Sequence, residues 1–140
     1  GRGMGATVFL CEAFHAPIRL ARPRFALKYP VEPAEVEAVA AVNGVSIGSK
    51  SSSVRALPRC VAEGDHEGKK FLVFELLGSD LARFFAHVSG GSGWYVPMKH
   101  RWRILRVLGR LLVRRLQAIH RCGYLHGDVA AQNVLFGRTA

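Results

Sequence analysis

The stretch YLHGDVAAQNVLFG, residues 124–137, places two polar side chains at a fixed spacing between apolar segments. Asp128 and Asn133 follow a long amphipathic segment and precede the apolar run 134–136. A carboxylate can orient a hydroxyl nucleophile and accept its proton, and a carboxamide oxygen can coordinate Mg²⁺. The spacing therefore predicts a loop that holds a general base and a metal ligand. We interpret His126 as a residue that braces this loop, not as a ligand or base.

Glycines mark the start of the chain, where GRGMGATV (residues 1–8) precedes an apolar run. A glycine-rich backbone can approach phosphates closely and present its N–H groups. A P-loop is excluded because no Gly-Lys-Ser/Thr follows, and a dinucleotide-binding turn is disfavoured because a strand is expected next, not a helix. Lys28 ends the apolar segment FALK (residues 25–28). It is either an inward lysine that needs an anion or an edge-strand lysine that faces water.

Hydrophobic periodicity predicts strands in the first half of the chain and helices in the second. Apolar runs indicate strands at residues 7–12, 57–65 and 69–78. The run at 18–30 indicates either one strand or two, with Pro23 at a turn and Pro30 at its end. Helices are expected at 32–44, from Gly78-Ser79 with Ser79 as the N-cap, and from Pro97 to about Arg121. A Ser/Gly-rich loop is expected at 44–56, and short strands at 124–125 and 133–137. This order predicts a segregated α+β fold with a boundary near Gly78.

The chain has 140 residues and a net charge of +10, and seven of its arginines lie between positions 101 and 121. We interpret these arginines as a solvated helix face. A nucleic-acid partner is not expected, because Trp102 is the single aromatic residue among these arginines, where base stacking needs a series of aromatic residues. No membrane partner is expected either, since no apolar run approaches the roughly 18 residues that span a bilayer. The three cysteines lack metal-binding spacing, which favours reduced thiols and an intracellular location, cytoplasmic or nuclear.

Four features occur in order along the chain: a Gly-rich loop, a strand lysine, the strand end VFELLG and H-x-D-x-x-x-x-N after a long helix. Together they resemble the first half of the eukaryotic protein-kinase-like fold, whose signatures are GxGxxGxV, VAIK and HRDLxxxN. The segment AEGDHEGKKFLVFELLGSDL, residues 62–81, is similar to the casein kinase 1 and related families. The resemblance covers almost the whole chain. It implies a small antiparallel sheet lobe with one helix at residues 1–78, which binds ATP, and a partial helical lobe at 79–140.

The resemblance also implies roles for individual residues. Asp128 would be the catalytic base, Asn133 a Mg²⁺ ligand, and Lys28 the residue that binds the α- and β-phosphates. Phe74 would be the gatekeeper. The further residues expected around ATP are Gly1, Gly3, Val8, Glu35, Glu75, Leu77 and Leu135. Within this set, Glu35 would pair with Lys28, for which Glu37 is the other candidate, and the backbone of Glu75 and Leu77 would meet adenine.

The catalytic loop departs from the family pattern at three positions. Gly127 replaces the usual arginine, Ala130 stands where Ser/Thr kinases have lysine, and Gln132 replaces the arginine of tyrosine kinases. No fixed cation in this loop would then neutralise the transferred phosphoryl group. The expected reaction is transfer of the ATP γ-phosphoryl to a protein hydroxyl, on Ser or Thr in preference to Tyr. The alternatives are a small-molecule phosphotransferase resembling aminoglycoside or choline kinases, and a pseudokinase that acts as a binding module.

The resemblance places an Asp-Phe-Gly segment, whose aspartate holds Mg²⁺, roughly ten to fifteen residues after Asn133. The sequence in hand stops at Ala140. We therefore expect it to be the N-terminal half of a catalytic domain, and to be inactive in this form.

Overall fold

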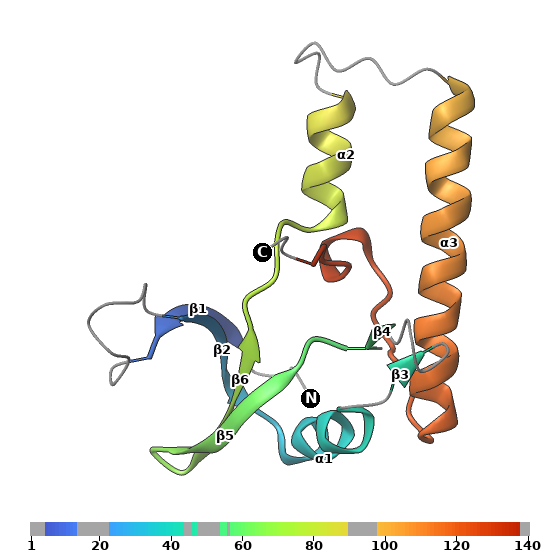
Figure 1. Cartoon of the computed structure of the whole chain (residues 1–140). Coiled ribbons are helices and arrows are strands. Elements are labelled where there is room, and N and C mark those ends of the chain that lie inside the picture. Colours follow the sequence, from blue (N-terminus) through green and yellow to red (C-terminus); the bar gives the residue numbers. More distant parts are fainter. Residues whose placement is uncertain are drawn as a thin grey trace. The chain divides into compact units, whose positions relative to one another are not determined.

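The computed structural model describes residues 5–13, 23–43, 46–47, 54–55, 57–89 and 98–137 (Figure 1). The described residues fall into two compact units. The first unit lies within 1–45 and 57–76, and the second within 46–56 and 77–140. The first contains an antiparallel sheet with one helix, and the second is mainly helical. The fold is α+β, as the sequence predicts.

The sheet of the first unit has four strands in the order β1-β2-β6-β5, all antiparallel. Its strands are β1 (Thr7–Glu12), β2 (Arg24–Val31), β5 (Cys60–His66) and β6 (Lys69–Glu75). Leu72 in β6 is 1% exposed and anchors the core of this unit. The two-residue turn between β5 and β6 has positive φ at Glu67 (51°) and Gly68 (73°), as a type I′ hairpin requires.

Strand β2 does not end at Pro30 as expected, but continues to Val31. The pairing of β2 with β6 shifts register between Lys28 and Val31. Proline has no N–H to donate to the neighbouring strand. A strand can therefore contain a proline where its pairing is irregular, as it is here. The peptide bond between Tyr29 and Pro30 is cis.

Helix α1 (Pro33–Val42) matches the helix expected at 32–44. Pro33 stands in its first turn, where a missing N–H costs nothing, and Asn43 caps its end through an N–H bond to the Val39 carbonyl. The Asn43 side chain also donates to the Cys60 carbonyl and accepts from the Cys60 N–H, at 3.4 and 3.2 Å. Val42 is 2% exposed. These contacts fix α1 against the sheet.

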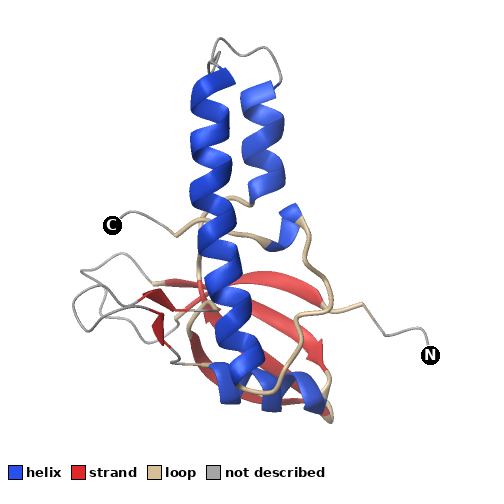
Figure 2. Ribbon diagram, turned by 90° about the vertical axis from the view of Figure 1, so that its right-hand side faces the viewer, coloured by secondary structure: helices blue, strands red, loops and turns tan. Residues whose placement is uncertain are grey.

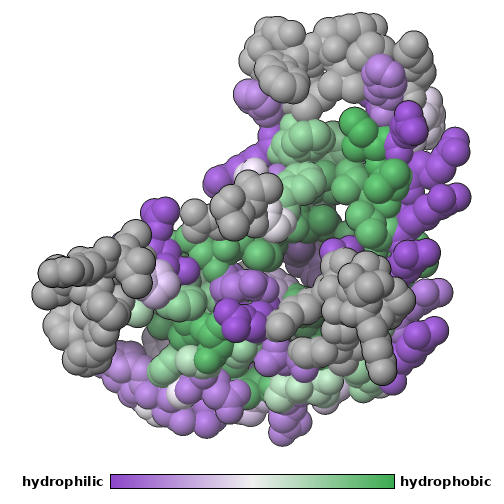
Figure 3. All heavy atoms as spheres, viewed as in Figure 1, coloured by the Kyte–Doolittle hydropathy of each residue, from purple (hydrophilic) through white to green (hydrophobic). Residues whose placement is uncertain are grey.

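The second unit contains α2 (Leu81–Ser89) and α3 (Met98–Arg121), which lie side by side (Figures 1 and 2). The prediction that Ser79 caps α2 is wrong: Asp80 Oδ1 accepts the Arg83 N–H at 2.8 Å, so Asp80 is the cap. α3 ends as expected at Cys122-Gly123, where Gly123 has φ +85°. Apolar side chains gather on the side of α3 that faces α2, and hydrophilic ones line its outer edge (Figure 3).

Two further predictions for the second unit are wrong. Within the expected loop 44–56, Ser46–Ile47 (β3) and Val54–Arg55 (β4) pair as a two-stranded sheet. Neither 124–125 nor 133–137 forms a strand; the second region contains the 3₁₀ helix η1 (Ala131–Asn133) and a single bridge from Leu135 to Asp80. The bridge cannot extend into a ladder, because the chain turns into α2 directly after Asp80.

Candidate functional site

The first unit brings together a strand lysine and a helix glutamate. Lys28 lies on β2, and Glu35 lies in the first turn of α1; the Lys28 Nζ and Glu35 Oε1 atoms form a hydrogen-bonded ion pair. Their side chains are 30% and 37% exposed, so an anion could still reach the ammonium group. Of the two glutamates considered, the structure pairs Glu35 with Lys28, whereas Glu37 is exposed.

Val8 lies on β1 directly opposite Lys28. Opposite residues of an antiparallel pair project from the same face of the sheet, so Val8 and Lys28 share a face. The Val8 side chain is 63% exposed, as a residue that covers a ligand would be before the ligand binds. The two glycines expected to cover ATP, Gly1 and Gly3, lie outside the described residues.

The end of β6 carries the segment expected to meet adenine. Glu75 pairs with Arg59 twice: the Glu75 N–H donates to the Arg59 carbonyl at 2.9 Å, and Glu75 Oε1 accepts the Arg59 N–H at 2.6 Å. The carboxylate thus braces the preceding strand, a role that the sequence did not indicate. Within the described residues, Leu77 makes no backbone hydrogen bond. Phe74, the expected gatekeeper, is half-buried on β6.

The second unit brings Asp128 and Asn133 together. Asn133 Nδ2 donates to the Asp128 carboxylate at 2.8 Å and to the Asp128 backbone carbonyl at 3.0 Å. The 3₁₀ turn η1 places Asn133 for this contact, with its N–H bonded to the Ala130 carbonyl. Both side chains are exposed. The Asn133 Oδ1 atom, which takes no part in these bonds, is the oxygen that could coordinate a cation.

The backbone around Asp128 is held by its neighbours. His126 Nδ1 accepts the Asp128 N–H at 3.3 Å, which agrees with a bracing role, although the His126 side chain is exposed. Gly127 between them has φ +73°. This left-handed conformation is unfavourable for residues with a Cβ atom, so the glycine meets a backbone requirement of the loop.

The loop is fastened to the start of α2. The Phe136 N–H donates to the Ser79 carbonyl at 3.0 Å, and the Gly78 N–H donates to the Phe136 carbonyl at 2.8 Å. The rings of Phe136 and Phe84 pack with their centroids 5.4 Å apart. Leu135, expected beneath adenine, remains 47% exposed. The sequence showed these aromatic residues as apolar, but not that they would anchor the loop.

A protein-only metal cage does not form in the described part of the chain, where no group of three or more His, Cys, Asp or Glu side chains could hold a metal ion. Mg²⁺ is usually bound by one or two protein oxygens together with substrate phosphates and water. Asn133 and Asp128 fit that mode, in which the phosphates of a nucleotide provide the remaining oxygens.

No helix in the described residues is both long and apolar enough to cross a membrane. No protein-family model matches the chain. The chain is similar to a probable casein kinase I homolog of Encephalitozoon cuniculi (strain GB-M1), with 28% identity over 120 residues. The match covers 81% of this chain and 33% of the relative, so the chain spans about a third of the relative's length. The chain is therefore a distant, kinase-like homologue of a casein kinase I-type protein.

Proposed function

We propose that the chain provides the ATP-binding lobe and the catalytic loop of a protein-kinase-like phosphotransferase. The acceptor would be a protein hydroxyl, on Ser or Thr in preference to Tyr. The observation that carries the proposal is the ion pair between Lys28 and Glu35, because it holds an ammonium group on the sheet face that Val8 shares. The homology to a probable casein kinase I homolog supports it. We expect this reaction to take place inside the cell, in the cytoplasm or nucleus, as the three cysteines without pairing spacing favour.

Each residue would have a distinct task in this reaction. Lys28, kept in place by Glu35, would bind the α- and β-phosphates. Asp128 would orient the acceptor hydroxyl and accept its proton, and Asn133 would hold Mg²⁺ through Oδ1. Mg²⁺-ATP would supply the phosphoryl group and part of the charge neutralisation. The adenine ring would lie against Val8 and Leu135 and meet the backbone at Glu75 and Leu77, with Gly1 and Gly3 over the phosphates.

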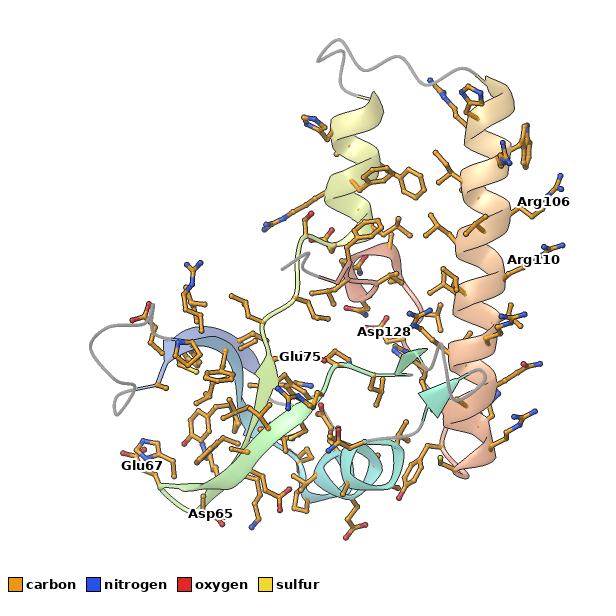
Figure 4. All side chains as sticks on the ribbon, in the orientation of Figure 1. Asp65, Glu67, Glu75, Arg106, Arg110 and Asp128 are labelled. Carbon is orange, nitrogen blue, oxygen red and sulfur yellow. The ribbon has the colours of Figure 1, made fainter. Side chains whose placement is uncertain are left out.

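The matched substitutions Asp128→Asn and Asp65→Asn test the proposal. Asparagine at 128 keeps an oxygen that can accept from Asn133, but it cannot take a proton. Transfer of labelled phosphate from ATP to a mixture of protein substrates should fall by roughly 10²- to 10⁴-fold in the intact protein. Within the described residues, Asp65 near the hairpin tip pairs with Lys70 alone (Figure 4), so its substitution should leave transfer unchanged. Equal activity of wild type and Asp128→Asn would show that Asp128 is not the base.

The conformation of Gly127 favours a second candidate, a phosphotransferase that acts on a small molecule. The left-handed backbone at this position disfavours the arginine typical of protein kinases, and Ala130 adds no cation. The same assay with choline or an aminoglycoside as the acceptor separates the candidates. Transfer to these acceptors but not to proteins would favour the second.

A further inference from the structure

The outer face of α3 carries a straight row of arginines. Its members are separated by three, four, four and seven positions, so at 3.6 residues per turn they lie along one side of the helix. All are exposed, and we call them the arginine row: Arg103, Arg106, Arg110, Arg114 and Arg121. In Figure 4, Arg106 and Arg110 point away from the side of α3 on which Asp128 lies. The row is therefore separate from the candidate catalytic loop.

Within the described residues, no acidic side chain neutralises the charge of the arginine row. α3 contains no aspartate or glutamate. Within the part of the chain that the structure describes, no carboxylate pairs with a guanidinium of the row. Like charges four positions apart destabilise a helix. A row of this kind therefore costs α3 stability, and an anionic partner would relieve that cost.

Apolar side chains flank the row. Val107 and Val113 are 54% and 55% exposed. By helical spacing they lie on either side of the row, whereas the continuous apolar stripe of α3 (Leu108, Leu112 and Leu116) lies on the opposite side of the helix. A helix that binds a membrane surface buries its apolar stripe in the lipid. A lipid surface in contact with the arginines would not meet the stripe of α3, so a membrane is disfavoured as the partner of this row.

We propose that the arginine row of α3 binds an acidic helical segment of a partner protein. A helix presents carboxylates at the same intervals of three and four residues, so two such rows can align along their length. The planar guanidinium group forms two parallel hydrogen bonds with a carboxylate, which favours arginine over lysine for this purpose. Val107 and Val113 would pack against apolar residues beside the partner's carboxylates. Nucleic acid fits less well, since Trp102 is the single aromatic residue among the arginines of α3, where a base-stacking surface needs several.

A binding experiment with two labelled peptides tests this surface on the intact chain. One peptide is helical, with glutamates in a single row and leucines beside them. The second has the same composition, but its glutamates are distributed around the helix. Fluorescence anisotropy should show tighter binding of the first peptide. Arg106→Gln/Arg110→Gln should weaken that binding roughly five- to tenfold, since each exposed ion pair contributes a factor of about two to five.

The control variant Lys69→Gln/Arg115→Gln removes the same charge outside the row. Lys69 is exposed on β6, and Arg115 donates to the Leu111 carbonyl. Binding should remain within about twofold of wild type. Equal weakening in both variants would overturn the proposal, because attraction would then depend on net charge alone. Equal binding of the two peptides would also overturn it, as would binding of duplex DNA or phosphatidylserine vesicles without binding of either peptide.

Discussion

Two lysines on the same sheet provide a matched test of the proposed nucleotide site. Lys28 on β2 pairs with Glu35, and Lys70 on β6 pairs with Asp65 at 2.8 Å. Exposed ion pairs contribute roughly 0.2 to 1 kcal/mol to stability. Lys28→Met should therefore lower the unfolding free energy by less than about 1 kcal/mol, and the melting temperature by at most roughly 2–4 °C. If Lys28 binds the phosphates of ATP, its loss should weaken ATP binding far more than it destabilises the fold.

Thermal unfolding followed by circular dichroism, with and without Mg²⁺-ATP, measures both effects. At a concentration 100 times its Kd, a ligand stabilises the folded state by about 2.7 kcal/mol, or roughly 5–10 °C in melting temperature. Wild type and Lys70→Met should both show this shift, and Lys28→Met should not. The reasoning is refuted if Lys28→Met keeps the full ATP-induced shift, or if Lys70→Met loses it equally.

Three further predictions concern the elements around the site. Asp80→Ala should lower the unfolding free energy by about 0.5–2 kcal/mol in urea titrations, and Ser79→Ala by much less, because Asp80 is the cap. Gly127→Ala should destabilise by about 1–2 kcal/mol, whereas Gly109→Ala within α3 should stabilise by about 0.5–1 kcal/mol in the same assay. Burial raises the pKa of the Cys60 thiol, so the fold favours its neutral form; stability should fall through the pH range above the ordinary thiol pKa, and Cys60→Ala should reduce that fall.

The elements that the sequence predicted well have strong local signals. α1 begins at Pro33 and ends at Asn43, and α3 ends at Gly123; each boundary residue acts through its own backbone. The turn of the β5–β6 hairpin contains Gly68, which adopts positive φ readily and is the local signal for this turn. Such signals act over a few residues and do not depend on contacts with distant parts of the chain.

The wrong prediction for the segment after Asn133 depends on a partner that is distant in sequence, whereas the pairing of β3 with β4 and the cap of α2 are local. Ser79 and Asp80 are both good N-cap residues, and in the structure Asp80 is the one that accepts the Arg83 N–H. The apolar run after Asn133 has strand composition, but it meets a segment that turns at once into α2, so one bridge forms. The apolar pattern of one segment does not show how many extended residues the partner segment has available for pairing.

In the candidate site too, the spacing of residues in the sequence did not decide which side chains meet. Glu35 and Glu37 are two positions apart and therefore lie on different sides of α1, so only one can face Lys28. The rotation of α1 about its axis decides which, and Val42 in the core and Asn43 against Cys60 determine that rotation. Spacing from Lys28 alone left both glutamates open, and the structure selected Glu35.

Gly127 has a consequence for regulation, if the proposed phosphotransfer holds. An arginine here, the residue that in many protein kinases binds a phosphorylated activation loop, would have to adopt φ +73°, at a cost of about 1–2 kcal/mol. The loop instead positions Asp128 through two local contacts, the His126 ring and the Asn133 amide. Neither contact needs a phosphate group to form. Asp128 would thus be oriented without prior phosphorylation, and treatment with a phosphatase should leave transfer to protein substrates unchanged.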